Sequence, residues 1–153
     1  MRTFATLLAL CLAGTASAGM KADPVEWIVG DTTFSGYVVH DDAASGPRPG
    51  LVMVPNWMGV NASAVEKAKG VAAEGYVVLV ADMYGTGLRP ANAEEAGQAA
   101  GAVYADREGM RARINAALDT LKAQPGVDTT RLGAFGFCFG GSTVLELARS
   151  GTA

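Results

Sequence analysis

Short apolar runs and longer amphipathic segments alternate along most of this chain. Continuous apolar runs occur at residues 51–54 and 76–81, and such runs are typical of strands that are buried on both faces of a sheet. A third short apolar run follows Arg131 in the predicted strand 131–135. The segments between these runs show helical periodicity, so the strands are predicted to alternate with helices. Because this alternation produces βαβ units, the chain is predicted to have an α/β fold with a mostly parallel sheet.

Capping residues and apolar stripes predict four helices. A capping box at residues 63–66 begins the first helix, and Asn92 begins an alanine-rich second helix. Asp106 caps a third helix, and a fourth is predicted over residues 142–149. The apolar stripe of the third helix consists of Met110, Ile114, Leu118 and Leu121.

The first part of the chain has a different pattern. Residues 25–29 and 34–39 are predicted strands joined by the turn 30–33, which is typical of an antiparallel hairpin. The hairpin makes the predicted sheet a mixed one. Residues 40–49 are predicted to form a loop, in which His40 would be a solvated side chain.

The composition is that of one globular domain, with 153 residues, 50% hydrophobic content and a formal net charge of −3. No basic patch is present in the sequence, so nothing indicates a nucleic-acid partner. No group of His, Cys and acidic residues has the spacing of metal ligands, and we predict neither a metal nor another cofactor. The predicted sheet ends at the strand 131–135 with an uncovered edge, so we expect residues 19–153 to be the N-terminal portion of a longer domain.

Residues 1–18 are predicted to form an export signal peptide. Arg2 supplies a positive start, residues 4–13 form an apolar core too short to span a bilayer, and residues 16–18 form an Ala-x-Ala cleavage site. The mature protein is therefore expected to be periplasmic or secreted, with no membrane attachment after cleavage. An uncleaved membrane anchor is the alternative.

Cys138 is the central residue of the most informative motif. Cleavage of the signal would remove Cys11 and leave Cys138 as the only thiol, which in an exported protein is either reactive or protected by burial. Cys138 lies in Gly136-Phe137-Cys138-Phe139-Gly140-Gly141, between an apolar run and a helical segment. A strand, Gly-x-nucleophile-x-Gly and a helix form a nucleophile elbow, here with Cys in the usual place of Ser.

The spacing of this motif has a steric reason. The nucleophile occupies a strained turn, and the residues two before and two after it approach closely, so both must be small, as Gly136 and Gly140 are. The following helix presents free N–H groups and a positive dipole end, which favour a thiolate. Two other interpretations remain open. The Cys could be a small buried hydrophobe, or the turn could bind a phosphate, although neither Gly-x-Gly-x-x-Gly nor a Walker pattern fits.

Three segments resemble the dienelactone hydrolase family of α/β-hydrolases. They are the elbow at residues 136–141, residues 82–85 after one buried strand, and residues 57–61 after another. The resemblance implies an α/β-hydrolase fold. It also implies a Cys-His-Asp triad that hydrolyses a small-molecule ester or lactone.

The resemblance also assigns roles to residues of this chain. It implies that Cys138 is the nucleophile and that the backbone N–H groups of Trp57 and Phe139 form the oxyanion hole. The elbow glycines are Gly136, Gly140 and Gly141. Asn56 and Trp57 are the candidates for the substrate pocket.

The sequence departs from the family pattern in several places. No His follows Cys138, and Glu146 is the only acidic residue that does. The triad His and acid are therefore expected beyond residue 153, and this fragment is expected to be inactive alone. Asn56 stands where the best-studied type has a Glu that helps activate the thiol, and Thr86 stands where that type has a substrate-binding Arg.

The remaining polar residues allow more than one interpretation. Asp82, at the end of a strand, is either a site carboxylate or a loop cap, and Arg107, Arg111 and Arg113 are predicted to form a solvated helix face. Two rival functions remain beside the hydrolase. A non-catalytic binding module on the same fold is favoured by Asn56, and a redox-active thiol protein is favoured by the single Cys of the mature chain.

Overall fold

The computed structural model describes residues 19–152, so the predicted signal peptide lies outside the described residues. Within them, strands and helices alternate after an opening hairpin. The elements are β1 (Met20–Val29), β2 (Thr32–Asp41), β3 (Arg48–Val54), α1 (Ala62–Ala72), β4 (Val77–Val80), α2 (Ala93–Ala105), α3 (Arg107–Lys122), β5 (Val127–Gly136) and α4 (Phe139–Arg149).

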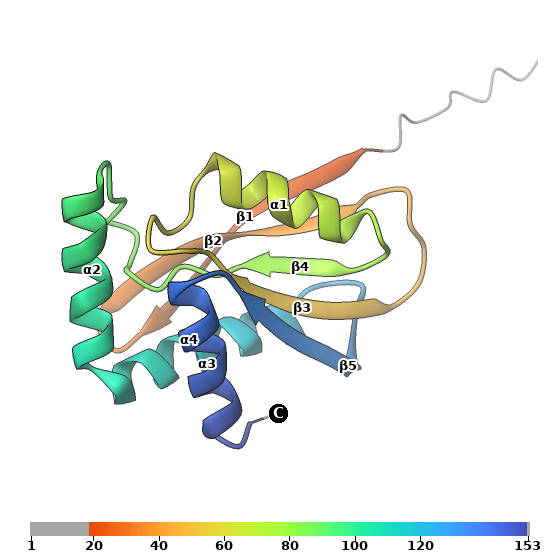
Figure 1. Cartoon of the computed structure of the whole chain (residues 1–153). Coiled ribbons are helices and arrows are strands. Elements are labelled where there is room, and N and C mark those ends of the chain that lie inside the picture. Colours follow the sequence, from red (N-terminus) through yellow and green to blue (C-terminus); the bar gives the residue numbers. More distant parts are fainter. Residues whose placement is uncertain (1–18, 153) are drawn as a thin grey trace, which may run out of the picture.

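The five strands form one mixed sheet in the order β1-β2-β4-β3-β5. Strand β2 is antiparallel to β1 and to β4, whereas β3 is parallel to both β4 and β5. The carboxyl ends of the three parallel strands therefore meet at one edge of the sheet, and α2 stands beside that edge (Figure 1). The predicted α/β fold, with an antiparallel hairpin joined to a parallel sheet, is confirmed.

Helices cover both faces of the sheet (Figure 1). Helix α1 packs through Ala68 and Ala72 on one face, together with Met53 of β3 and neighbouring valines. Helices α3 and α4 cover the other face, where Val52 and Val54 of β3 lie. Successive side chains of a strand point to opposite faces, so a central strand covered on both sides needs a continuous apolar run. This explains the sequence of β3 and β4.

The hairpin and the first helix differ in detail from the prediction. The turn between β1 and β2 contains only Gly30 and Asp31, with Gly30 in the left-handed region (φ 58°), so both strands are longer than predicted. Helix α1 is capped by Asn61, whose side-chain oxygen accepts from Ala64 N–H at 3.0 Å. The predicted capping box at residues 63–66 is therefore wrong, because the helix begins one residue before it.

The other helices agree more closely with the sequence patterns. Asn92 and Asp106 cap α2 and α3 as predicted, each accepting from a backbone N–H three residues later. Helix α4 begins at Phe139, earlier than predicted, because the turn leads directly into the helix. The four stripe residues of α3 are all buried. Within residues 19–152, no helix combines the length and the apolar composition needed to cross a membrane.

Candidate active site

Cys138 lies in the sharp turn between β5 and α4, and its backbone is strained. Its φ of 54° and ψ of −112° make it the only non-glycine residue with a positive φ among residues 19–152. The residue is exposed, and it is a free cysteine. The thiol is thus presented at the carboxyl end of the parallel strands by a conformation that side chains rarely adopt.

Two of the three elbow glycines are required by close backbone contacts. A Cβ atom on Gly136 would overlap the backbone of Gly140, and a Cβ on Gly140 would overlap the carbonyl oxygen of Val54. A Cβ on Gly141 would lie 3.7 Å from the Gly136 oxygen, which is an ordinary contact. The steric reason predicted for Gly136 and Gly140 is therefore present, while Gly141 is not constrained in this way.

The first residue of α4 provides a backbone donor beside the thiol. Helix geometry leaves the first N–H groups without intrahelical acceptors. The N–H of Phe139 donates to no acceptor within residues 19–152. Its ring is buried and packs against Tyr84 and Tyr104, each with a centroid separation of 5.4 Å. This packing holds the helix start in position.

The loop after β3 provides a second free donor. The carbonyl oxygen of Asn56 accepts from Gly59 N–H at 2.9 Å, and its side-chain oxygen accepts from Met58 N–H at 3.1 Å. The N–H of Trp57, within this turn, has no acceptor in the described part of the chain. Phe137 N–H donates to Val54 O at 3.2 Å, which ties the elbow to the strand that carries this loop.

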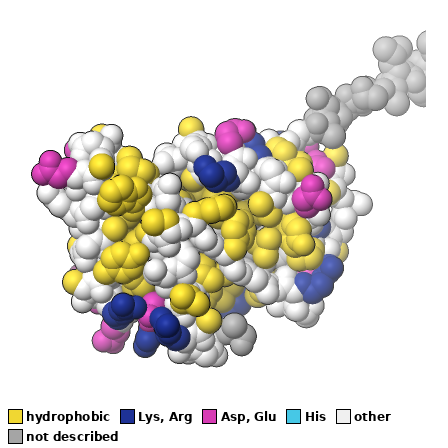
Figure 2. Space-filling view, viewed as in Figure 1, with side chains coloured by type: hydrophobic (Ala, Val, Ile, Leu, Met, Phe, Trp, Pro, Cys, Tyr) yellow, Lys and Arg dark blue, Asp and Glu magenta, His cyan; other side chains and the backbone are white. Residues whose placement is uncertain are grey.

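The side chains of Asn56 and Trp57 point to different surroundings. Asn56 lines a cavity of about 210 Å³ together with Met58 and Phe137. The Trp57 ring lies over α2, where a Cβ on Gly97 would be 3.8 Å away, and it remains 39% exposed. Figure 2 shows hydrophobic side chains gathered on the surface beside α2. Trp57 is therefore not among the residues that line the cavity beside Asn56.

Asp82 organises the loop after β4. Its side chain is 1% exposed. One carboxylate oxygen accepts from Tyr84 and Gly85 N–H groups at 2.9 and 3.2 Å, and the other accepts from Ser35 N–H and the Arg89 guanidinium at 3.2 and 3.1 Å. A carboxylate with four donors has little capacity left for chemistry. Of the two interpretations of Asp82, the loop cap describes its contacts.

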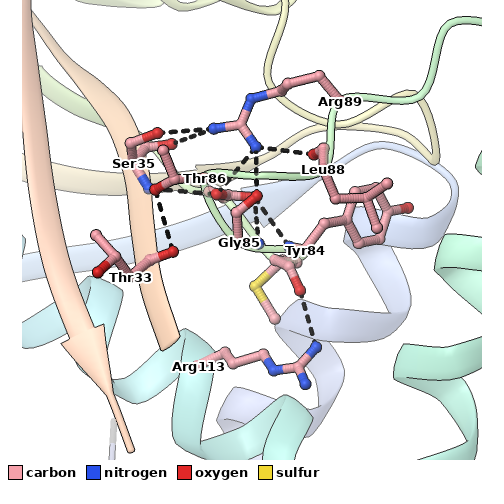
Figure 3. Close-up of polar contacts among 10 residues, drawn as sticks. Thr33, Ser35, Tyr84, Gly85, Thr86, Leu88, Arg89 and Arg113 are labelled. Carbon is pink, nitrogen blue, oxygen red and sulfur yellow. Dashed lines mark hydrogen bonds and ion pairs between the residues drawn. The ribbon is translucent and has the colours of Figure 1, made fainter. Parts of the chain in front are cut away.

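Arg89 completes this loop and was missed by sequence reasoning. Its guanidinium donates to the carbonyl oxygens of Gly85 and Leu88, at 2.8 and 2.9 Å, and to the hydroxyl of Ser35 at 2.7 Å (Figure 3). Thr86 is also engaged within the loop, since its hydroxyl donates to Thr33 O at 3.1 Å. The only sequence signal was an arginine within a Gly- and Pro-containing loop.

Glu146 lies about two helical turns after Cys138 and is covered by arginines. Arg107, Arg111 and Arg149 contact its carboxylate at 2.7, 2.8 and 2.8 Å. Hydrogen bonds from Arg149 above all, and from Arg111 and Arg107, lower the pKa of Glu146 and outweigh the effect of burial. Arg107 and Arg111 are exposed, as predicted for a solvated helix face, but both also bind a buried partner on α4, which the sequence did not predict.

The third arginine of that face is also engaged. Arg113 donates to Met83 O at 3.0 Å, and its guanidinium lies 5.7 Å from the centre of the Phe34 ring. Arg107 and Arg111 thus join α3 to Glu146 of α4, whereas Arg113 joins α3 to the loop after β4.

His40 is not near the candidate site. It belongs to β2, not to a loop as predicted, and its Nε2 lies 2.9 Å from the Asp23 carboxylate. Its neighbour Val39 pairs with Val78 at the beginning of β4. His40 therefore lies where the parallel strands begin, whereas Cys138 lies where they end. Among residues 19–152, no three His, Cys, Asp or Glu side chains are grouped as ligands for a metal ion.

Several known proteins are similar to this chain in sequence or in fold. A dienelactone hydrolase-like promiscuous phosphotriesterase from metagenomic libraries is 43% identical with a TM-score of 0.82, over 87% of this chain and 55% of that chain. The dienelactone hydrolase of Anabaena variabilis is 20% identical with a TM-score of 0.59, over 82% of this chain and 56% of its own, and shows the fold alone. A Bradyrhizobium sp. protein described as a probable 2-oxo-3-(5-oxofuran-2-ylidene)propanoate lactonase is 32% identical over 108 residues, 69% of this chain and 43% of that protein.

The chain spans about half the length of these relatives, with 55% of the metagenomic structure and 43% of the Bradyrhizobium protein covered. A sequence model of the dienelactone hydrolase family matches residues 34–153, which include the Trp57 loop, the Asp82 loop and the elbow. This match covers most of the chain. The chain therefore belongs to the dienelactone hydrolase family.

Proposed function

We propose that the whole protein hydrolyses carboxylic esters or lactones with Cys138 as its nucleophile. One observation carries this proposal: an exposed cysteine sits in a strained turn at a helix N-terminus, next to a free backbone N–H. Strain is retained where the surrounding structure enforces it, and such positions cluster at active sites. Family membership supports the same chemistry.

The proposed reaction has two stages. The Cys138 thiolate attacks the carbonyl carbon and forms a C–S bond, while the carbonyl electron pair moves to oxygen. The oxyanion accepts hydrogen bonds from the N–H groups of Phe139 and Trp57. Collapse expels the alcohol oxygen, which takes a proton from the general acid. Water then attacks the thioester carbonyl and gives a proton to the base. This step releases the carboxylic acid product and restores the Cys138 thiolate. The His and acid of the triad are proposed to lie outside the described chain.

The substrate is proposed to be an uncharged ester or lactone. Thr86 occupies the place where the resemblance expects an arginine for a substrate carboxylate, and its hydroxyl is bound to Thr33 O. The nearby Arg89 is engaged by Asp82 and Ser35. These contacts leave no free cation in this loop to bind a carboxylate.

The test is turnover of p-nitrophenyl acetate by the whole protein and its Cys138→Ala variant. We expect kcat/KM to fall by about a thousandfold or more, because the nucleophile is lost. Retention of most of the activity would remove Cys138 from the mechanism. Formation of a sulfenic acid at Cys138 without any ester turnover would favour the redox-active thiol, and ester binding without turnover would favour the binding module.

Two further proposals concern the chain itself. Cleavage of the proposed signal would give a mature protein that begins at Gly19 and lies outside the cytoplasm, which N-terminal sequencing from the native host tests. A retained Met1 would contradict export.

Residues 19–153 alone are proposed to lack multiple-turnover esterase activity, because His40 is their one histidine and lies at the end of the sheet opposite Cys138.

A further inference from the structure

Tyr84 contacts both segments that carry the free backbone donors. Its hydroxyl donates to the carbonyl oxygen of Trp57 at 2.9 Å. Its ring packs against the ring of Phe139, with 5.4 Å between centroids. The same ring lies over Gly59, where a Cβ would be only 3.2 Å from it and where φ is 69°. One side chain therefore links the loop after β3 to the start of α4.

The position of Tyr84 is itself well determined. Its N–H donates to the buried carboxylate of Asp82, which is also bound by Ser35 and Arg89. Burial of the phenol is the main reason why the pKa of Tyr84 is raised, and negative charge on Tyr104, Asp82 or Cys138 raises it further. The hydroxyl is consequently a neutral donor at physiological pH.

The contacts explain how Tyr84 can control the donors. Its hydrogen bond holds the peptide that follows Trp57, and the Asn56–Gly59 hydrogen bond closes the same turn. Together they orient the Trp57 N–H. Contact with the Phe139 ring restrains the residue that carries the other N–H. Stabilisation of an oxyanion depends on donors that are already in place before the reaction.

We infer that Tyr84 is a positioning residue that holds the two backbone donors of the proposed oxyanion hole at a fixed separation. The inference rests on the proposed function. It assigns Tyr84 no proton transfer and no contact with the substrate. Removal of its hydroxyl should therefore slow the formation of the tetrahedral intermediate without altering the reactivity of the thiol.

The experiment compares Tyr84→Phe with Tyr104→Phe in the whole protein. Tyr104 is a matched control, because its ring packs on Phe139 at the same 5.4 Å and its hydroxyl donates to Ser142 Oγ at 3.4 Å, not to the Trp57 loop. We expect Tyr84→Phe to lower kcat for p-nitrophenyl acetate about tenfold with KM unchanged. Tyr104→Phe should stay within about twofold of the wild type.

A second measurement separates the hole from the nucleophile. The rate at which iodoacetamide alkylates Cys138 should be the same in Tyr84→Phe as in the wild type, and so should its pH dependence. Substitution of Tyr84 by 4-aminophenylalanine keeps the ring and restores a donor, so it should recover most of kcat. This variant also tests the inference if Tyr84→Phe unfolds.

Several outcomes would overturn the inference. Full kcat in Tyr84→Phe would show that the hydroxyl is not needed, and an equal loss of kcat and of alkylation rate would show that it acts on the thiol. Failure of 4-aminophenylalanine to recover kcat in a folded protein would count against a donor role. If the wild type shows no turnover that depends on Cys138, the proposed function fails first, which is a distinguishable result.

Discussion

The two ends of helix α4 differ in whether their polar groups have bonding partners. At the N-terminal end, Cys138 is exposed, has a positive φ and makes no side-chain cap, and Phe139 N–H has no acceptor within residues 19–152. Further along the same helix, Glu146 is 2% exposed and is bound by three arginines. The N-terminal end therefore has an N–H without an acceptor, whereas the Glu146 carboxylate has three cationic partners.

This contrast indicates that the two parts of helix α4 have different roles, one structural and one proposed to be chemical. A buried carboxylate is tolerated only when partners compensate its charge, and Glu146 has three. It is the only acid after Cys138, yet its contacts commit it to joining α3 and α4. Strain and unpaired donors, in contrast, are retained at functional sites. These features support the proposal that the chemistry takes place at the N-terminal end of this helix.

The largest expected effect comes from adding one methyl group at the N-terminal end. Gly140→Ala places a Cβ against the carbonyl oxygens of Val54 and Pro55. We expect the free energy of unfolding to fall by about 3 kcal/mol and kcat/KM to fall by at least about a hundredfold. Urea denaturation and ester turnover of the whole protein provide the measurements.

The matched control is Gly141→Ala, one residue further along. Its Cβ would make an ordinary contact, and alanine is the better helix former, so we expect a gain of about 0.5–1 kcal/mol in the free energy of unfolding. Equal destabilisation by both substitutions would contradict the steric account of the elbow.

The next effect should be confined to stability. Glu146→Ala leaves Arg107, Arg111 and Arg149 without their shared partner, so we expect a clear loss in the free energy of unfolding. The loss should exceed that of Arg107→Gln, which leaves two arginines bound. Ester turnover of the folded fraction should stay within about twofold of the wild type. A loss of turnover without a loss of stability would give Glu146 a role that its contacts do not indicate.

Acid should reveal the same cluster. The arginines lower the pKa of folded Glu146 below its ordinary value of 4.5, so its contribution to stability is complete above that pH and is lost as the pH falls through the lowered pKa. We expect the stability advantage of the wild type over Glu146→Gln to be constant near neutrality and to shrink below pH 4.5. Urea denaturation of both proteins across this range is the measurement. An advantage that grew on acidification would reverse the assignment.

The smallest effect concerns the strain at Cys138. Cys138→Gly and Cys138→Ala should both abolish turnover, but only glycine accepts a φ of 54° without a steric penalty. We expect Cys138→Gly to be more stable than Cys138→Ala by about 1 kcal/mol, measured by urea denaturation. Equal stability would mean that the turn stores no strain.

Several features of the fold and of the candidate site could be predicted from the sequence because they depend on neighbouring residues. The elbow is one, since the glycine spacing around Cys138 and the apolar run before it are local. The caps at Asn92 and Asp106 are others, because each bonds an N–H three residues later. The cap of α1 was misassigned to Ser63 because Asn61 and Ser63 are both good capping residues, and the pattern alone did not distinguish them.

The sequence by itself determined the alternation of strands and helices, the buried strands and the elbow at Cys138, because these follow from side-chain periodicity and from contacts within one turn. Only the tertiary structure decided what the polar side chains bind. Ser35 reaches Asp82 across 47 positions, Arg107 reaches Glu146 across 39, and Tyr84 reaches Trp57 across 27. These pairs meet because the order β1-β2-β4-β3-β5 places distant loops at one edge of the sheet and distant helices on one face. No local rule encodes that order, since it results from burying every apolar face at once.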